Sequence, residues 1–545
     1  MEALRDISTA ASDEVQRIVV SPSAKGSDSV ETGGMSEKET PQFDWLSHWY
    51  PINVVETLDP SKPHAAQLLG KNLVIWNDGP TVEGVKQVGE WHVFEDACPH
   101  RLGPLSEGRV EADGTLLCSY HGWRFDGEGE CADLPYSPEQ VAERQRGSCR
   151  ARCGGLPTKV ADGFIWVFPR PGPDGYAASE RVALPLIDEL HDPALEGRWK
   201  WKVPAGVRDF PCGWDMMVEN TLDPAHFCAA HHGTLGNRYT DPAPYSFETT
   251  RGLDTETGFA VRGDFGVLEF QPPCLVKYVP NYAGMPFNGS LVLATYCVPT
   301  KPGWVRPLAT VLNDREYSSP KPVLSERALS IFMAGLLPTW LGHVLSSVVL
   351  HQDAGLLYKQ YRNLRERGYN PGFEAAQREA SPPAAAPPAA AAAAAAETGR
   401  EGKAAAASGD GAPTYEQLVY TPTSVDRGVL LFRQWLRTRG GDGVPWQCED
   451  VLPPRGTEDI YDMWDAHTQH CQYCQDAYRN LEAAKYASVA VLGLSLLAMP
   501  DASPERTAIV LTSATAAGAL HLFNGLFRRY EFSHADNDPW WSQSP

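Results

Sequence analysis

The chain has 545 residues, of which 43% are hydrophobic and 10% aromatic, enough for two or three folded domains with sizeable cores. Its formal net charge of −21 argues against a nucleic-acid partner, which would need a basic surface for the phosphates. Twelve cysteines at uneven spacings do not form a disulfide scaffold, and they favour a reducing compartment.

The N-terminal part of the chain reads as a polar segment followed by a β-rich domain. Residues 1–42 are polar and lack the apolar run of a secretory signal, so we predict a disordered segment. The β-rich domain is predicted over residues 43–186. Its strands are expected at residues 73–76, before the turn Asn77-Asp78-Gly79, and at 91–94 and 164–168.

Two short motifs in this domain suit an iron–sulfur cluster. Cys98-Pro99-His100 is followed, after seventeen intervening residues, by Cys118-Ser119-Tyr120-His121. A Rieske [2Fe–2S] cluster needs two thiolates on one iron and two imidazoles on the other, and each motif supplies one of each. A structural zinc site also uses two cysteines and two histidines, but zinc motifs rarely alternate Cys and His within each half at this spacing. The pattern therefore predicts that Cys98, His100, Cys118 and His121 bind a Rieske cluster.

The residues in and around these motifs resemble those of a known family. Cys98-Pro99-His100-Arg101 and the run from Cys118 to Trp123 resemble the Rieske domain of ring-hydroxylating oxygenases. Residues 104–110, Pro-Leu-Ser-Glu-Gly-Arg-Val, are similar to the plant and algal branch typified by pheophorbide a oxygenase. That branch also contains Rieske components of the chloroplast import machinery. The resemblance implies an α+β protein, in which the β-rich Rieske domain precedes a helix-grip-type catalytic domain.

The next domain, predicted over residues 187–372, carries a second candidate iron site. Asn220, Asp223, His226 and His231 have the spacing N-x2-D-x2-H-x4-H. Two histidines and one carboxylate suit a mononuclear Fe(II) with positions left open for dioxygen and substrate. On an ideal helix His226 and His231 would point about 140° apart, so the helix must bend or end between them. His232 is a competing ligand.

The resemblance supplies the remaining roles at this site. It implies that the third ligand lies on a later helix, and we choose Asp353, with His351 as the alternative. It also implies that Asp223 hydrogen-bonds both His226 and a Rieske histidine of a neighbouring subunit, with Asn220 supporting this network. An electron path of that kind implies a ring of subunits, most simply a homotrimer.

The C-terminal part is interrupted and then changes character. Residues 373–413 are rich in Ala and Pro and are predicted to form a disordered, low-complexity insertion. Residues 414–484 are expected to complete the catalytic domain and contain the pair Cys471-Gln472-Tyr473-Cys474. This pair could be a redox dithiol, a metal site completed by His467 and His470, or a buried inert pair. We favour a dithiol that thioredoxin reduces.

Two apolar stretches, residues 486–499 and 507–527, flank a polar turn. Basic residues lie at both outer ends: Arg479, Lys485, Arg528 and Arg529. Residues 485–527 therefore predict a transmembrane helical hairpin with both ends on one side, followed by a tail at 528–545. Two buried helices of a soluble domain are the alternative.

Together these features predict a Rieske non-haem iron oxygenase, similar to pheophorbide a oxygenase, at the thylakoid or inner-envelope membrane of a chloroplast. The expected cofactors are a [2Fe–2S] cluster and a mononuclear Fe(II). The expected partners are ferredoxin, dioxygen, a chlorophyll-derived tetrapyrrole, the membrane and thioredoxin. Two alternatives stay open: a hydroxylase of protochlorophyllide, chlorophyllide or another ring compound, and a redox-sensing Rieske component of a chloroplast import complex.

Overall fold

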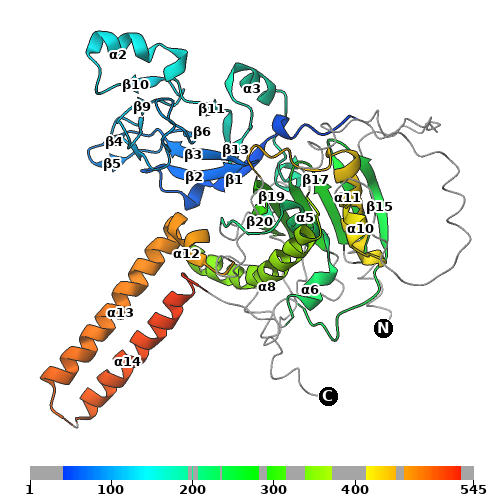
Figure 1. Ribbon diagram of the computed structural model, residues 1–545. Coiled ribbons are helices and arrows are strands. Elements are labelled where there is room, and N and C mark those ends of the chain that lie inside the picture. Colours follow the sequence, from blue (N-terminus) through cyan, green and yellow to red (C-terminus); the bar gives the residue numbers. More distant parts are fainter. Residues whose placement is uncertain are drawn as a thin grey trace, which may run out of the picture.

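The computed structural model describes residues 41–193, 199–200, 207–232, 236–264, 266–280, 291–314, 338–370, 413–449, 460–501 and 503–529 (Figure 1). The predicted N-terminal segment and Ala/Pro insertion lie outside the described residues, apart from 41–42 and Pro413. All but two residues of the predicted tail also lie outside them.

Short antiparallel sheets build the N-terminal domain. The strands predicted at residues 73–76, 91–94 and 164–168 are confirmed as β3, β6 and β13. The sheet orders are β1-β13-β12, β11-β6-β3-β2, β10-β9-β8-β7 and the hairpin β4-β5. The strands are β1 (Tyr50–Val54), β2 (His64–Leu68), β3 (Lys71–Asn77), β4 (Thr81–Val82), β5 (Val85–Lys86), β6 (Trp91–Glu95), β7 (Arg109–Val110), β8 (Leu116–Leu117), β9 (Arg124–Phe125), β10 (Cys131–Asp133), β11 (Gly155–Leu156), β12 (Thr158–Ala161) and β13 (Phe164–Val167). The helices are α2 (Glu139–Arg146), α3 (Gly172–Ser179) and α4 (Asp188–His191), with single 3-10 turns at Trp45–Ser47, Val55–Thr57 and Cys149–Ala151.

A seven-stranded antiparallel sheet with helices against it forms the second domain, which confirms the predicted α+β class. The strand order is β14-β20-β19-β18-β17-β16-β15. The strands are β14 (Trp199–Lys200), β15 (Phe247–Asp254), β16 (Gly258–Gly263), β17 (Gly266–Gln271), β18 (Leu275–Pro280), β19 (Leu291–Lys301) and β20 (Trp304–Asp314). The helices are α5 (Trp214–Leu222), α6 (Ala225–Ala229), α8 (Thr339–Glu366), α10 (Tyr415–Leu418), α11 (Arg427–Thr438) and α12 (Met463–Ala466), with 3-10 turns at Ser424–Asp426 and Thr468–His470. Helix α5 packs on β17 to β20, α11 packs on β15 and β16, and α8 contacts α5 (Figure 1).

One apolar core runs from the first domain into the second. Trp166 of β13 meets Tyr296 of β19 edge to face, with ring centroids 5.3 Å apart. The Tyr296 hydroxyl donates to the Pro185 carbonyl between the domains at 2.8 Å. Both rings are fully buried, so the two domains are in direct contact at this point and no solvent layer separates them. A smaller separate core lies beneath the candidate cluster loops.

A buried ion cluster fixes α5 against the helices around it. Arg433 of α11 contacts Asp215 at 2.7 Å and also Glu219, both on α5. The hydroxyl of Tyr369 donates to Asp215 at 3.0 Å, and that of Tyr415 donates to Glu219 at 3.1 Å. The cluster is buried, so each charge depends on these partners for its solvation.

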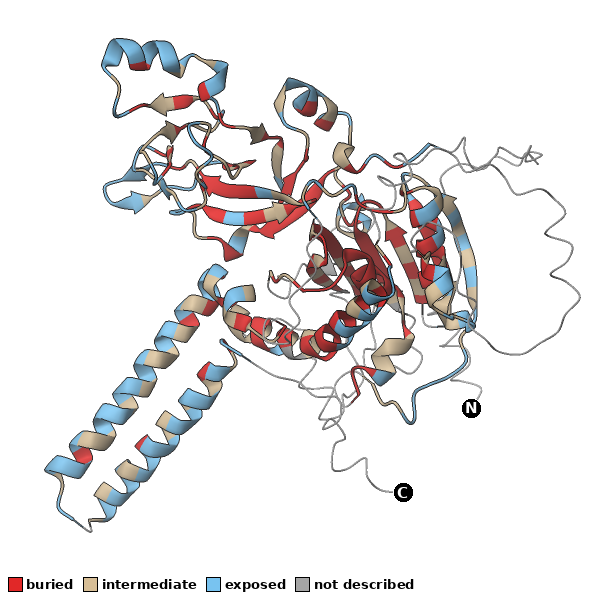
Figure 2. Ribbon diagram, in the orientation of Figure 1, coloured by how far each residue is buried: buried red, intermediate tan, exposed pale blue. Residues whose placement is uncertain are grey.

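The last two helices form a hairpin that projects away from both domains (Figure 1). They are α13 (Gln472–Ala498) and α14 (Pro504–Gly525), with mean hydropathies of 1.4 and 1.2 over their most apolar windows. Only 6% and 11% of those windows are buried, so most of their apolar side chains face outward (Figure 2). This exposure contradicts the alternative of two helices buried in a soluble domain.

Candidate metal centres

The two predicted Rieske motifs form a pair of similar loops. In each loop the cysteine N–H is bonded to a carbonyl five residues later: Cys98 to Gly103 and Cys118 to Trp123, both at 2.8 Å. Each loop also has a left-handed residue four positions after its cysteine, Leu102 at φ +60° and Gly122 at φ +73°. These matching turns direct one cysteine and one histidine from each loop towards a shared position.

The two cysteines at this site are more deeply buried than the two histidines. Cys98 and Cys118 are almost completely buried, whereas His100 is exposed and His121 is half-buried. Burial raises the pKa of the Cys98 thiol to about 12, and the neighbouring Cys118 adds to the rise. The rings of His100 and His121 lie 4.5 Å apart, and Trp123 stacks on His100 at 4.7 Å. Two buried cysteines next to two more exposed imidazoles fit a Rieske cluster, in which thiolates and imidazoles bind different irons.

The second predicted site forms where α6 meets α8. Helix α6 ends at Ala229, between His226 and His231, so the predicted break between the two histidines is confirmed. Asp353 comes from the middle of α8. One ligand atom of each of these three residues lies within 4.8 Å of those of the other two. The structure thus brings together the ligand set that the sequence predicts, and its role as an iron site stays a prediction.

Hydrogen bonds on the outer ring nitrogens orient both histidines. Nδ1 of His226 is bonded to the backbone carbonyl of Asp223, and Nδ1 of His231 is 3.0 Å from Oε1 of Gln352. A carbonyl partner makes each Nδ1 the protonated nitrogen, which leaves Nε2 with its lone pair free for a metal. Nε2 of His231 lies 3.2 Å from Oδ2 of Asp353. The sequence does not indicate that Gln352 orients His231, although Gln352 adjoins Asp353.

The buried Asp353 carboxylate also fits a cation. Within the described part of the chain its Oδ1 has no hydrogen-bond partner. Burial lowers the pKa of His231, but the hydrogen bond and the charge of Asp353 outweigh burial, so the net change is a raised pKa. Bound iron would replace the proton as the positive charge between these two groups.

The competing ligands lie apart from this set. His351 is buried against Tyr461, and burial, with a contribution from Arg208, lowers its pKa to about 2. Nδ1 of His232 accepts from the backbone N–H of Arg238 at 3.2 Å. Among the described residues neither histidine belongs to the group formed by His226, His231 and Asp353.

Asp223 contacts His226 in a way that differs from the prediction. Its backbone carbonyl makes the contact, because its carboxylate instead accepts from the N–H of Ala225 at 2.8 Å. Burial raises the pKa of this carboxyl group. The backbone carbonyl of Asn220 accepts from the N–H of Asp223 at 3.2 Å and so holds the end of α5. The Asp223 side chain is therefore not needed to orient His226.

A further set of ligand-type residues, here called the Cys2His2 set, comprises His343, His467, Cys471 and Cys474. His467 joins the cysteine pair as one predicted alternative has it, but His470 does not. His343, on α8, takes the fourth place instead. The sequence carries no local signal for His343, because more than a hundred residues separate it from the cysteines.

Family models and relatives agree with these centres. Residues 48–146 match the model of the Rieske [2Fe-2S] domain, and residues 270–370 match that of pheophorbide a oxygenase. The chloroplast pheophorbide a oxygenase of Arabidopsis thaliana is 30% identical, over 79% of this chain and 72% of the relative. The chain belongs to the pheophorbide a oxygenase family.

Two more chloroplast proteins are similar to this member of the pheophorbide a oxygenase family. The chloroplast pheophorbide a oxygenase of Oryza sativa subsp. japonica is 29% identical over 96% of this chain and 91% of the relative. The chloroplast flavonoid 8-hydroxylase 2 of Ocimum basilicum is 26% identical over 78% and 72%. Membership confirms a Rieske-type oxygenase with a [2Fe–2S] cluster and a mononuclear iron. The shared compartment of the relatives confirms the predicted chloroplast localisation.

Proposed function

We propose that this chain uses dioxygen and electrons from ferredoxin to oxygenate a chlorophyll-derived tetrapyrrole. The convergence of His226, His231 and Asp353, in a chain with a complete Rieske ligand set, carries the proposal. Bound iron supplies the redox chemistry: single-electron transfer at the cluster and dioxygen activation at the mononuclear site. Three protein ligands leave open positions for dioxygen and substrate.

The protein's own part in this reaction is to hold its ligands in one orientation. The Asp223 carbonyl and the Gln352 amide each fix one imidazole, so no ring has to turn when iron or substrate binds. Burial of His231 and Asp353 keeps water from the ligand atoms and strengthens their electrostatic attraction for a cation.

Electron delivery is proposed to cross between subunits of a homotrimer. In Figure 1 helix α6 lies on the far side of the second domain from β9 and β10, which adjoin the cluster loops. The exposed His100 is accessible to another chain. We place Asp223 between the two sites: its backbone carbonyl holds His226, and its carboxylate would accept the imidazole N–H of a Rieske histidine of the neighbouring subunit.

Product analysis tests the substrate. The full-length protein, with reduced ferredoxin, is given pheophorbide a, protochlorophyllide or a flavone, and oxygen uptake is measured with product masses from ¹⁸O₂. We expect incorporation of oxygen into the pheophorbide. Incorporation only into the flavone would instead assign the chain a flavonoid substrate, as the name of the basil relative indicates for that protein.

A non-catalytic role in chloroplast import is the alternative. It predicts no oxygen incorporation with any ring compound, even though both irons are present. The orientation of His226 and His231 for a metal with open positions favours the enzyme, because a sensor needs no such positions.

The hairpin of α13 and α14 is proposed to anchor the protein in the membrane. Val491 and Leu511 are 47% and 62% exposed, so an arginine at either place would face lipid. Each such arginine costs about 3 kcal/mol near the centre of a membrane helix. Val491→Arg/Leu511→Arg should move the protein to the soluble fraction of chloroplast extracts. Tyr420→Arg, at an 89% exposed site off the hairpin, is the control and should stay in the membrane fraction.

A dithiol reduced by thioredoxin is the second candidate role for Cys471 and Cys474. Their spacing and their free thiols support it. Their burial opposes it, because thiol exchange needs an accessible sulfur. Mass spectrometry after oxidant, and then after reduced thioredoxin, tests this role. A pair that is unchanged by both treatments would remove it.

A further inference from the structure

The structure assigns a tetrahedral zinc site, separate from both iron centres, to the Cys2His2 set of His343, His467, Cys471 and Cys474. One ligand atom from each residue lies within 4.8 Å of those of the other three. Such a spread fits four ligands around one ion at zinc–sulfur and zinc–nitrogen distances of about 2.0–2.3 Å.

Contacts within the set already join nitrogen to sulfur. Nε2 of His467 is 3.2 Å from Sγ of Cys474. Nδ1 of His343 is 3.4 Å from Sγ of Cys474 and 3.5 Å from Sγ of Cys471. The imidazole rings meet edge to face, with centroids 5.0 Å apart, so they approach the sulfurs from different directions. Four donors that converge from different directions suit a tetrahedral ion.

The outer nitrogen of His467 is held as it is in other metal-binding histidines. Its Nδ1 lies 2.9 Å from the backbone carbonyl of Val207, which makes Nδ1 the protonated nitrogen. Nε2 therefore presents its lone pair to the sulfurs. An isolated dithiol would not need this arrangement.

Charge and burial also favour a metal. All four residues are buried, and two thiolates neutralise a divalent cation while both imidazoles remain neutral. Binding releases the two thiol protons to solvent and involves no oxidation or reduction. The resulting group has no net charge, so it can be enclosed at low cost. With four protein ligands it has no open position, which marks a structural site.

The proposed zinc ties the hairpin to the helix that carries Asp353. His343 is on α8, ten residues before Asp353 and therefore about 15 Å away along the helix axis. Cys471 immediately precedes α13, and Cys474 lies in its first turn. Trp340 of α8 packs edge to face on Phe523 of α14 beside the set, with centroids 5.9 Å apart. One ion would thus join α8, the segment after α12, and the base of the hairpin.

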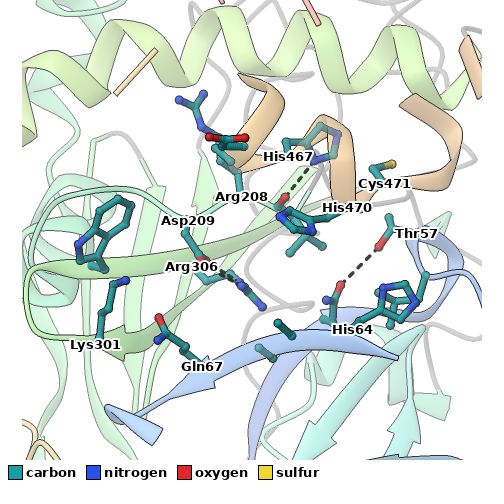
Figure 3. A pocket seen from close by; sticks show the side chains of 18 of the residues that line it. Thr57, His64, Gln67, Arg208, Asp209, Lys301, Arg306, His467, His470 and Cys471 are labelled. Carbon is teal, nitrogen blue, oxygen red and sulfur yellow. Dashed lines mark hydrogen bonds and ion pairs between the residues drawn. The ribbon is translucent and has the colours of Figure 1, made fainter. Parts of the chain in front are cut away.

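A cavity of about 420 Å³ lies beside the set (Figure 3). His467 and Cys471 form part of its wall, and His470 lies beside them. Farther along the wall Arg306 pairs with Asp209 at 2.6 Å. The cavity therefore borders one histidine and one cysteine of the set.

Metal analysis of the full-length, detergent-solubilised protein tests this site. We expect about one zinc per chain beside about three irons. Cys474→Ser and His343→Ala should each lower zinc to below about a tenth of an equivalent while labile sulfide and the Rieske resonance signal remain. Cys149→Ser, at an exposed cysteine outside the set, is the matched control and should keep full zinc.

Alkylation of the wild-type protein gives an independent reading if the variants do not fold. Cys471 and Cys474 should resist a thiol reagent until a zinc chelator is added. A disulfide between them, equal labelling with and without chelator, zinc retained in Cys474→Ser, or four irons and no zinc would each overturn the assignment. None of these measurements depends on turnover, so failure of the zinc site and failure of the proposed oxygenase reaction are distinguishable.

Discussion

The described residues contain two sets of two cysteines and two histidines, and these are assembled in different ways. The Rieske set lies within residues 98–121, on two loops whose turns match each other. The Cys2His2 set spans residues 343–474 and depends on α8 reaching the base of α13. A set built on adjacent loops is visible in the sequence, whereas a set built by helix packing becomes visible only in the fold. The mononuclear site lies between these cases, since His226 and His231 are local but Asp353 is not.

The largest expected effect tests whether the Rieske site keeps its cluster when the mononuclear site is disrupted. His226→Ala and His231→Ala should each abolish oxygen uptake, because each removes one of three ligands. The Rieske resonance signal should persist, since the two sites share no residue. His232→Ala is the neighbouring control and should keep turnover. Loss of turnover in His232→Ala alone would show that the wrong histidine has been chosen.

The second effect tests how strongly the folded catalytic domain depends on the buried ion cluster of Arg433, Asp215 and Glu219. Arg433→Met leaves Asp215 and Glu219 of α5 buried without their cation, which should cost about 3–5 kcal/mol in free energy of unfolding. Arg437→Met is the matched control on the same helix, because its pair with Glu416 is exposed and worth about 0–1 kcal/mol. Chemical denaturation followed by circular dichroism measures both changes. Equal midpoints would refute the structural role of the cluster.

The third effect concerns the link between the two iron sites. Asp223→Asn keeps the backbone carbonyl that holds His226, so both metals should remain. Turnover should fall about 10–100-fold, because the amide loses the charge that would hold a Rieske imidazole of the neighbouring subunit. Rapid mixing of the reduced cluster with dioxygen and substrate measures the rate of electron transfer. An unchanged rate would exclude the bridge.

The smallest effect concerns one orienting hydrogen bond. Gln352→Leu removes the acceptor of the His231 Nδ1–H and should lower iron affinity or turnover about tenfold. Gln352→Glu retains an acceptor and should recover most of the iron affinity. Iron titration followed by activity separates the two quantities. Equal loss in both variants would indicate a packing role for Gln352 instead.

The features that follow from the sequence depend on local geometry. The spacing of the Rieske motifs, the strands at β3, β6 and β13, and the end of α6 between His226 and His231 are all consequences of residues close in the chain. Asp353 could be chosen only by family resemblance. His343 and the Val207 carbonyl could not be found, because both contacts join segments that are distant in sequence.

Helix α13 shows a different limit. The sequence predicts the hairpin from residue 485, but its first helix begins at Gln472, thirteen positions earlier. Hydropathy reports the part suited to lipid and does not detect the polar turns that precede it. Those turns carry Cys474, so the missed segment is the one that attaches the hairpin to the catalytic domain.

The topology of the hairpin also bears on how membrane attachment relates to folding. The chain leaves the base at Glu482 and returns at Asn524, whose amide donates to the Glu482 carboxylate at 2.8 Å. The guanidinium of Arg528 meets the Tyr478 hydroxyl at 2.8 Å just inside that point. Because the two ends are already adjacent, a few glycines and serines could close the gap, and the entropy of a loop changes only slowly with its length. We therefore expect that the apolar segment between Glu482 and Asn524 can be replaced by a short turn while the base of the hairpin stays packed on the catalytic domain.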